Sequence, residues 1–471
     1  MRQNSQWPVP LCNVWGCSGR QNAPIIMKKK TRGLHFWKNN GDDILLDADN
    51  LFWALGRRTG ETGTFIPKRT LELYAKFKEA LDEEIEDLRF GQELTAIYID
   101  PTDKCNAACQ YCYIPDDIKQ RGASLGKNEL DLILKKIAAH FRLEKRKQVI
   151  IFHAAEPLLV KDLLFEAISR YKNTFKFGIQ TNGLLLEKED VGFLIKNRVG
   201  IGISLDSASR DTNNRLRPSA SDAFKKVSQV LEWFNGYAGL NVITTITKHN
   251  VNQLPGMVEY LHSKKVPCVL MNPVRLTQVK ARALKPDEPA MTRSFIKAVD
   301  RAMELSKKTK HKLIIGNFTN TVLSIIAPAA RRLMCDISPC GGGRCFFTVT
   351  ATGDIVPCGE FIGIKGFTAG NIFKTSISQA MSSKPFKKIR ERTVEKIKEC
   401  ADCKLRNMCG APCPAELHSM GNMYQRSVFC EFYKSVIMHA FKMIKENKIG
   451  YLLRAASLEN LKYRYNLCAE R

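Results

Sequence analysis

Three cysteines fall within eight residues of one another, and their thiols could bind a soft metal centre. They are Cys105, Cys109 and Cys112, in the spacing C-x3-C-x2-C. Thiolates favour zinc, copper(I) and iron–sulfur clusters, but a structural zinc site uses four ligands, and no fourth cysteine or histidine is close in the sequence. A disulfide is the other alternative. The count of three is informative, because three thiolates on a four-iron cluster would leave one iron open to a small molecule.

The segment that must position these thiols lies directly before them. Residues 94–100 alternate in polarity and are rich in β-branched and aromatic side chains, which predicts a strand that Pro101 and Asp103 end. The cysteines then lie in the following loop. Further strands alternate with helices to about residue 275, which predicts an α/β fold with a parallel sheet and right-handed crossovers. The predicted strands are 94–100, 148–153, 175–180, 200–205, 240–246 and 267–273.

The cysteine loop resembles the cluster loop of the radical S-adenosylmethionine (radical SAM) enzymes. Tyr111 and Tyr113, which flank the last cysteine, match the aromatic positions of that family. The resemblance implies a partial (β/α)6 TIM-type barrel, a 4Fe–4S cluster on the three cysteines, and SAM on the open iron. Such barrels carry their chemistry at the carboxyl ends of the strands, where the next motifs fall.

The second predicted strand ends in a motif that resembles the family's Gly-Gly-Glu-Pro. Here the residues are Ala154, Ala155, Glu156 and Pro157, preceded by His153. The resemblance implies that this backbone and the Glu156 carboxylate hold the SAM amino group. Alanine disfavours the positive φ angles that glycine accepts, so the geometry of the two alanines is open. We expect His153 to be a packed residue at the strand end.

Two later strand ends complete the SAM site implied by the resemblance. Ser204 matches a position that contacts the SAM ribose or amino acid, and Tyr111 belongs to the same cofactor-binding set. Arg217 matches the arginine that meets the SAM carboxylate, a task that suits a guanidinium because it binds carboxylate bidentately. The loop is about one residue longer than usual, so Arg215 is the alternative.

A second cysteine field begins at Cys340 and resembles the SPASM extension of radical SAM enzymes. Its seven cysteines follow C-x12-G-x4-C, then C-x2-C-x5-C-x3-C, then a last cysteine, and Cys345 offers an eighth. The residues between Cys345 and Cys358 predict a hairpin that turns at 352–354. A zinc knuckle is the alternative for the middle group alone.

The SPASM resemblance implies two auxiliary 4Fe–4S clusters with four cysteines each. Full ligation would leave no open iron, which favours electron transfer over substrate binding. Cys268 and Cys335 match no ligand position and are expected to be ordinary thiols. The implied ligands are Cys340, Cys345, Cys358 and Cys413 for the first cluster, and Cys400, Cys403, Cys409 and Cys430 for the second.

The residue after Cys358 bears on the reaction. Anaerobic sulfatase-maturing enzymes, which belong to the same maturase group, place an aspartate there, whereas this chain has Gly359 followed by Glu360. The difference counts against sulfatase maturation. Glu360 is a candidate catalytic general base, and a surface carboxylate is the alternative interpretation.

Composition and net charge limit the classes of partner that this chain can have. Hydrophobic residues make up 44% and charged residues 25% of the chain, as in globular proteins, and no run of about 18 apolar residues predicts a membrane span. Sixteen cysteines without a signal peptide favour metal ligation in a reducing cytoplasm. The formal charge of +26 favours an acidic partner, either a peptide or a nucleic acid, unless it reflects only a basic solvated surface.

The domain organisation predicted from these patterns has six parts. Cys12 and Cys17 are expected to be incidental thiols of the first part, and Met27 is a candidate start of translation. In the second part we expect a strand near 44–46, a helix over 49–55 and a helix over 70–88. The parts are a disordered extension (1–31), a small cap or peptide-binding module (32–92), the barrel (93–275), a helical bridge (276–335), the SPASM domain (336–435), and a C-terminal helix with a basic tail (436–471).

Together these features predict a cytoplasmic, oxygen-sensitive radical SAM/SPASM oxidoreductase that modifies a ribosomally made peptide or protein by crosslinking, oxidation or epimerisation. A low-potential donor such as ferredoxin or flavodoxin would reduce the first cluster, SAM would be cleaved, and a 5′-deoxyadenosyl radical would take hydrogen from the substrate. The alternatives are sulfatase maturation, modification of a nucleic acid, and a non-catalytic iron–sulfur electron carrier. The SPASM extension favours a peptide over a nucleic acid, and no membrane partner is expected.

Overall fold

The computed structural model describes residues 34–38, 42–59, 63–66, 68–144, 146–331, 334–410 and 413–453. The expectations for residues 1–31 and for the basic tail after 453, with Cys12, Cys17 and Met27, lie outside the described residues. The described chain forms one four-stranded and one nine-stranded sheet. None of its helices is both long and apolar enough to cross a membrane.

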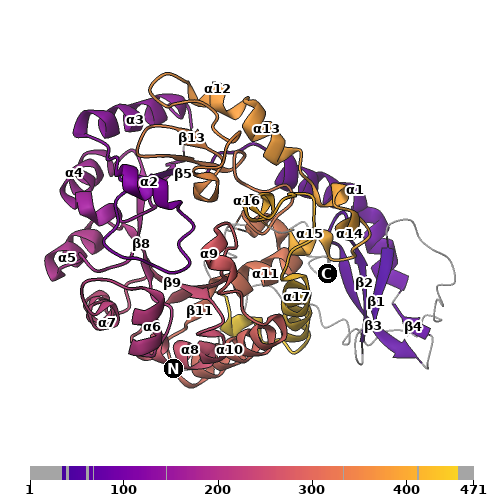
Figure 1. Cartoon of the computed structure of the whole chain (residues 1–471). Coiled ribbons are helices and arrows are strands. Elements are labelled where there is room, and N and C mark those ends of the chain that lie inside the picture. The colour runs from indigo at the N-terminus through magenta and orange to yellow at the C-terminus, as the bar shows by residue number, and fades with distance from the viewer. Residues whose placement is uncertain are drawn as a thin grey trace.

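The nine-stranded sheet curves into a partial barrel with helices on its outer face (Figure 1). Its order is β11-β10-β9-β8-β7-β6-β5-β12-β13, and every neighbouring pair is parallel except β12–β13. All six strands expected from the sequence are confirmed. They are β5 (Ala96–Ile99), β6 (Val149–Phe152), β7 (Lys176–Thr181), β8 (Gly200–Ser204), β9 (Leu240–Ile246) and β10 (Cys268–Pro273).

Alternation along these strands separates a dry outer face from a polar lumen. Ile97, Ile150 and Ile201 face the helices and are fully buried. Tyr98 and Gln180, each of which follows a buried isoleucine in its own strand, are only half-buried. The barrel helices are α3 (Lys127–His140), α4 (Lys161–Tyr171), α5 (Lys188–Lys196), α7 (Ala223–Phe234), α8 (Leu254–Ser263) and α10 (Glu288–Lys308).

The second cysteine field is joined to the barrel by strand pairing that the sequence did not reveal. Strand β12 (Phe346–Val349) continues the sheet parallel to β5, and β13 (Ile355–Val356) completes the predicted hairpin. At the opposite edge, the short strand β11 (Ile314–Ile315) pairs with β10. Helices of this region are α11 (Gly316–Ile326), α12 (Ile377–Met381), α13 (Lys384–Arg390), α14 (Lys398–Ala401), α15 (Arg406–Cys409), α16 (Pro414–Ser419) and α17 (Cys430–Lys445).

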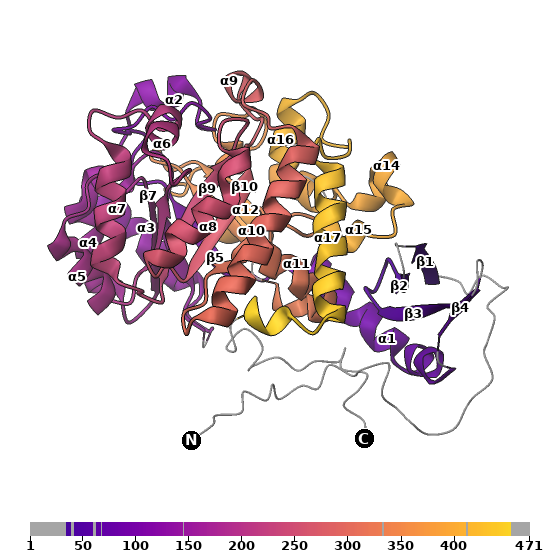
Figure 2. The ribbon, with the colours of Figure 1, turned by 90° about the horizontal axis from the view of Figure 1, so that it is seen from below.

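The N-terminal segment is an antiparallel sheet beside a long helix, set at one side of the barrel (Figure 2). The helix predicted over 49–55 is wrong, because Ile44 and Leu46 pair with Leu55 and Trp53 across a tight turn and so bury this apolar run as a sheet. The helix predicted over 70–88 is confirmed. The elements are β1 (Leu34–Lys38), β2 (Asp42–Asp47), β3 (Trp53–Thr59), β4 (Gly63–Phe65) and α1 (Lys68–Phe90).

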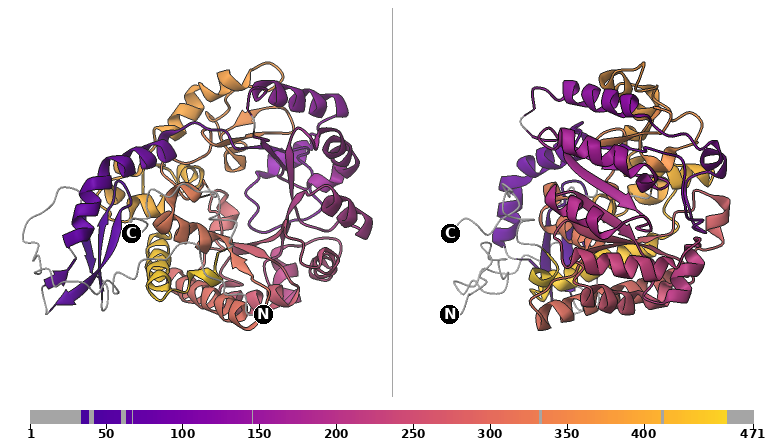
Figure 3. Two further views of the ribbon diagram at one scale, coloured as in Figure 1. Left: turned by 180° about the vertical axis from the view of Figure 1, so that it is seen from behind. Right: turned by 90° about the vertical axis from the view of Figure 1, so that its left-hand side faces the viewer.

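The N-terminal sheet packs against the cysteine-rich region, as two further views also show (Figure 3). Three side chains of the segment between Cys403 and Cys409 bind it. Lys404 Nζ donates to the carbonyl of Phe36 at 2.6 Å, and Asn407 Nδ2 donates to the carbonyl of Ala48 at 2.8 Å. Arg406 forms an ion pair with Asp49. The predicted domain boundaries stay predictions, but this segment is attached to the cysteine field rather than free of it.

Candidate cluster and cofactor site

The loop that carries Cys105, Cys109 and Cys112 follows β5 and is held at the barrel mouth. The backbone N–H of Cys112 donates to the carbonyl of Cys109 at 3.2 Å, and the loop also bonds to the chain around Pro218. All three thiols are half-buried. Burial, together with the nearby charges of Glu156, Cys109 and Cys112, raises the pKa of Cys105 to about 11. A bound cation would reverse this penalty by stabilising the thiolates.

Beside this loop, Tyr111, Asp206 and Arg217 form one buried network. The Tyr111 hydroxyl donates to Asp206, and Arg217 Nη1 donates to the same hydroxyl. Arg217 Nη1 is 3.7 Å from Asp206 Oδ2, and its side chain also lies in the field of Cys109. Arg215, the alternative from the sequence, is exposed on helix α6 (Arg210–Leu216). The structure therefore brings Arg217 to the cysteine loop and leaves Arg215 outside.

Glu156 is fully buried and is bound by the protein itself. Its Oε1 accepts hydrogen bonds from Leu158 N at 3.0 Å and Thr181 Oγ1 at 2.6 Å, and its Oε2 accepts one from Asn182 N at 2.8 Å. Burial raises the pKa of the carboxyl, and these three donors oppose that effect. The carboxylate thus joins the ends of β6 and β7 in one fixed position. Its predicted contact with the SAM amino group stays a prediction, as does that of Ser204 at the end of β8.

Ala154 and Ala155 both adopt left-handed backbone, with φ of 60° and 44°. This is the conformation that glycine accepts without steric cost and alanine does not. The sequence raised this conflict, and the structure shows that the chain keeps the backbone despite the two Cβ atoms. Ala154 is 8% exposed, so the strain is stored inside the site rather than in a free loop.

His153 does more than fill a strand end. Its Nε2 is 3.2 Å from the Tyr113 hydroxyl, and its Nδ1 is 3.5 Å from Oδ1 of Asp100, a buried carboxyl. A Cβ added at Gly359 would be 3.1 Å from His153 Cε1 and 3.3 Å from the Tyr113 hydroxyl. A larger residue at 359 therefore requires the histidine to move, which explains the glycine. Sequence reasoning missed Asp100, whose only signal was its place at the end of the first strand.

The strand-end region around His153, Tyr113 and Asp100 is here called the chamber. Glu360 lies in it, close enough for His153 to act on its charge, and is not a surface carboxylate. Its Oε2 is buried and has no hydrogen-bond partner in the part of the chain that the structure describes. Burial raises its pKa to about 7, while Arg275 lowers it and Glu416 raises it. Arg275 Nη1 is 3.6 Å from Oε2 of Glu416. A half-titrated carboxyl in a chamber at strand ends is suited to accept a proton near neutral pH.

The first group of the second cysteine field has a nearby thiol that the sequence did not assign to it, while the expected ligand set stays a prediction. Burial raises the pKa of Cys358 well above its usual range, and charge on Cys413, Cys340 and Cys335 adds to this effect. Cys335 keeps an exposed surface although many atoms surround it; burial raises the pKa of its thiol, and charge on Cys340 and Cys413 adds to the increase. The sequence had set it aside as an ordinary thiol, although it lies five residues before Cys340. The four thiols therefore lie close enough to influence one another.

Cys345, the ligand expected in that group, lies in a different environment. It is only 4% exposed, and its backbone carbonyl accepts a hydrogen bond from Thr95 N at 2.8 Å beside β5. Its strongest charged neighbours are Arg344, Cys340 and Glu93, whereas Cys358 and Cys413 are not among them. The motif spacing alone did not distinguish Cys335 from Cys345, because both lie five residues from Cys340.

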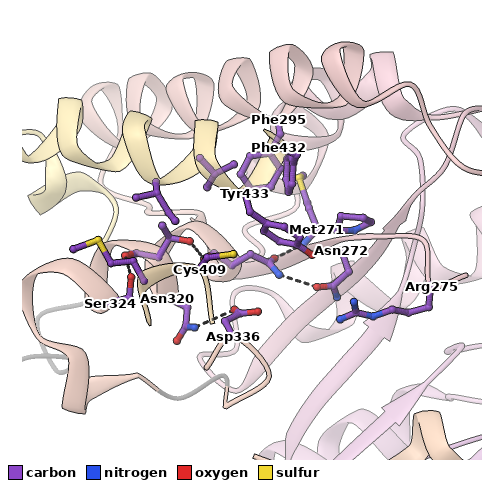
Figure 4. Close-up of a pocket in the computed structure, with 16 residues that line it drawn as sticks. Met271, Asn272, Arg275, Phe295, Asn320, Ser324, Asp336, Cys409, Phe432 and Tyr433 are labelled. Carbon is purple, nitrogen blue, oxygen red and sulfur yellow. Dashed lines mark hydrogen bonds between the residues drawn. The ribbon is translucent and has the colours of Figure 1, made fainter. Parts of the chain in front are cut away.

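The second group of the field, Cys400, Cys403, Cys409 and Cys430, lines a cavity of about 360 Å³. Trp37 of the N-terminal sheet forms part of its wall. Cys409 also lines a smaller cavity of about 50 Å³, together with Arg275 and Asp336 (Figure 4). In its wall, Asn320 Nδ2 donates to Asp336 Oδ2 at 3.0 Å. Cys409 thus lies between two cavities.

The donors in all three groups fit iron–sulfur clusters. Each group offers thiols, the ligands that bind such clusters. The first loop offers three, beside a buried arginine and a fixed carboxylate that suit a zwitterionic ligand, and the other two groups offer four each.

Comparisons with known proteins agree with this geometry. The profile of the radical SAM superfamily matches residues 99–261, and that of the SPASM iron–sulfur cluster-binding domain matches residues 340–404. An uncharacterized protein of Archaeoglobus fulgidus is 42% identical over 429 residues, 91% of this chain and 98% of the relative. A cysteine-type anaerobic sulfatase-maturating enzyme of Clostridium novyi is 22% identical over 350 residues, 70% of this chain and 91% of that enzyme.

Solved structures share the fold. Native anSMEcpe with bound AdoMet and the Cp18Cys peptide superposes with a TM-score of 0.65 at 19% identity, over 76% of this chain and 99% of the other. Streptococcus suis SuiB bound to its precursor peptide SuiA gives a TM-score of 0.57 at 14% identity, over 85% and 99% of the two chains.

The left-handed backbone makes a stability prediction. Ala154→Gly should raise the free energy of unfolding, because it removes a steric cost of about 1–2 kcal/mol and adds an entropic cost of about 0.5–1 kcal/mol. Urea denaturation of the apoprotein measures the difference. Ala167→Gly within helix α4 is the control and should lower the free energy by about 0.5–1 kcal/mol. Destabilisation by Ala154→Gly would contradict the left-handed conformation.

Proposed function

The chain belongs to the radical SAM superfamily and carries a SPASM iron–sulfur cluster-binding domain, and we propose that it is an enzyme that modifies a ribosomally made peptide or protein. The observation that carries the proposal is the first loop. Three thiols at the end of β5 lie beside the buried Arg217–Asp206–Tyr111 network and the fixed carboxylate of Glu156. A protein that only carries electrons would not need the arginine network and the fixed carboxylate beside its cluster.

We assign the cofactors by group. The three thiols of the first loop would hold the 4Fe–4S cluster that binds SAM. Eight further thiols would hold two auxiliary clusters, in which Cys335 takes the place first expected for Cys345, because Cys335 shares its environment with the other three ligands. The assigned auxiliary ligands are Cys335, Cys340, Cys358 and Cys413 for the first cluster and Cys400, Cys403, Cys409 and Cys430 for the second.

The residues of the barrel mouth position SAM. Arg217 binds the SAM carboxylate, and Asp206 and Tyr111 hold its guanidinium in place. The left-handed backbone at Ala154 and Ala155 would present peptide groups to the SAM amino group. Bound together at this site, the cluster and SAM would supply a 5′-deoxyadenosyl radical, with a ferredoxin or flavodoxin as electron donor. The surrounding buried side chains exclude water from that radical.

A peptide is the substrate class that the evidence favours. Two proteins with this fold bind peptides: anSMEcpe binds Cp18Cys and SuiB binds its precursor peptide SuiA. In this chain, Glu360 has an unpartnered buried oxygen, lies near Arg275 and His153, and is placed to take the proton that the substrate releases when it is oxidised.

Sulfatase maturation is the second candidate, and the Clostridium relatives favour it. The occupation of the space beside Gly359 by His153 and Tyr113 argues against it, because no carboxylate fits there without rearrangement. Incubation with cysteine- and serine-containing sulfatase peptides separates the two proposals. Mass spectrometry would show formylglycine only if this second function is correct.

The SAM-binding loop can be tested without a substrate. After anaerobic reconstitution, the wild type should hold about twelve irons, and the triple variant of Cys105, Cys109 and Cys112 to Ala should hold about eight and form no 5′-deoxyadenosine from SAM and dithionite. The control is Cys268→Ala in β10, which should match the wild type. Formation of 5′-deoxyadenosine by the triple variant would refute the assignment.

The choice between Cys335 and Cys345 has its own test. Cys335→Ser should perturb or empty the first auxiliary cluster, with a loss of up to about four irons, whereas Cys345→Ser should load fully. Iron analysis and electron paramagnetic resonance (EPR) of the reduced proteins report the difference. The reverse result would restore Cys345 as the ligand.

Glu360 is tested once a peptide that stimulates SAM cleavage is in hand. Glu360→Gln removes the base but preserves size, so product formation should fall about 100-fold or more. Cleavage of SAM without peptide should stay near the wild-type level, because the three thiols and the Arg217 network are unchanged in this variant. Glu304→Gln on the surface of α10 is the control. Equal product yields from Glu360→Gln and wild type would remove Glu360 from the mechanism.

A further inference from the structure

Two buried arginines near the second cysteine field have no role in the chemistry above. Arg344 is 1% exposed and Arg392 is 2% exposed. Arg344 Nη1 donates to the carbonyls of Leu88 and Gly91, at 3.0 and 2.7 Å, and Arg392 Nε donates to the carbonyl of Met423 at 2.6 Å. Of the remaining side-chain nitrogens of these two arginines, three are buried without a partner among the described residues: Arg344 Nε, Arg344 Nη2 and Arg392 Nη2.

The charged groups around these arginines are thiols rather than carboxylates. Cys345 and Cys340 act most strongly on Arg344 to stabilise its charge, and Cys340, Cys413 and Cys400 do so for Arg392. Burial opposes the charge of both guanidiniums. A buried charge without a counter-charge is strongly destabilising, so the fold requires a negative group where these thiols lie.

Other arginines of the region show what a balanced charge looks like. Arg275, which follows β10, has Cys413 among its charged neighbours and also Glu416 at 3.6 Å. Arg390, two residues before Arg392, donates to the carbonyls of Gly343 and Met381 at 2.9 and 2.7 Å, and its main charged neighbour is Glu391. Arg344 and Arg392 differ from both because no carboxylate is among the main groups that stabilise their charge.

We propose that Arg344 and Arg392 are the counter-charges of the first auxiliary cluster and raise its reduction potential. The inference rests on the proposed binding of that cluster by Cys335, Cys340, Cys358 and Cys413. Reduction adds one negative charge to a cluster, and fixed positive charges in a poorly solvated interior favour the more negative state. Arg392 also faces Cys400, so it acts on the second cluster as well, whereas Arg344 acts on the first alone.

Carboxylates act on the thiols of both groups. Cys358 has Glu360 beside it and Cys335 has Asp336, while Cys430 has both Lys434 and Glu431. The two arginines would therefore set the potential of the first cluster against these opposing charges. If that cluster is bound in its oxidised state, it would be an acceptor for the one electron that a substrate radical loses, and the accompanying proton would go to the base proposed above.

Reduction potentials measured by EPR-monitored redox titration test the proposal without any substrate. The background is the variant with Cys105, Cys109 and Cys112 replaced by Ala, so that only auxiliary clusters contribute. The variants are Arg344→Met and Arg392→Met, which remove the charge, and Arg392→Lys, which keeps it. Arg390→Met is the matched control, because Arg390 makes the same kind of carbonyl contacts without thiol neighbours.

We expect each methionine variant to favour the oxidised first cluster about tenfold, which corresponds to a potential about 59 mV lower for a one-electron couple. Arg392→Met should also lower the second potential, whereas Arg344→Met should not. Arg392→Lys and Arg390→Met should leave both potentials near those of the parent.

Two results would overturn the proposal in distinguishable ways. Potentials unchanged in both methionine variants, with full iron content, would refute the role of the arginines but leave the cluster assignment intact. A parent protein without two auxiliary clusters would refute the cluster assignment and the arginine role with it. If Arg392→Met does not load iron, Arg344→Met and Arg392→Lys still decide the outcome.

Discussion

The parallel ladder between β5 and β12 is the interaction on which the rest of the site depends. Phe346–Val349 pairs residue for residue with Ala96–Ile99, and bonds from Thr95 N to Cys345 O and from Asp100 N to Val349 O extend it at both ends. The first cysteine loop follows one of these strands directly, and the second cysteine field surrounds the other. One ladder thus places cysteines more than 200 residues apart around a common chamber.

The chamber is built from groups that would be unstable together in an ordinary core. His153, Asp100, Glu360 and Arg275 are buried or half-buried at strand ends, and several of their polar atoms lack partners among the described residues. Native cores seldom tolerate unpaired polar atoms except where function requires them. The same holds for the strained backbone at Ala154 and Ala155. The free-energy cost of these unpaired polar atoms and of the strained backbone is concentrated between the two cysteine fields, where SAM and substrate would meet.

Charge compensation organises the cysteine-rich region in the same way. Cys340, Cys358 and Cys413 pack in a small apolar cluster that includes Phe361 and Phe367, and buried arginines lie in the same region. The segment between Cys403 and Cys409 uses Lys404, Arg406 and Asn407 to bind the N-terminal sheet. The N-terminal segment also contributes Trp37 to the wall of the second cysteine group.

The sequence by itself determined the chemistry and the barrel, because both are written in local patterns. Thiol spacing, strand alternation and the motif around Glu156 each lie within a few consecutive residues, so periodicity and resemblance sufficed for six strands, the hairpin and the SAM loop. The backbone of the two alanines stayed open at that level, because the motif favours left-handed geometry and the alanine side chain disfavours it. The helix over 49–55 was wrong because its apolar residues are satisfied by pairing with β2 rather than by helical periodicity.

Only the tertiary structure decided which distant groups meet. Cys335 and Cys345 are equivalent in spacing, and the fold alone puts one among the other thiols and the other beside β5. Asp100 and His153 meet Tyr113 because β5 and β6 are neighbours, and Arg392 meets thiols of two groups because the chain folds back on itself. A short strand such as β12 carries no local signal of its partner, since pairing energy comes from residues far away in the sequence. The burial of each thiol and the charges that surround it are therefore set by the fold, and they decide which cysteines can form a common site.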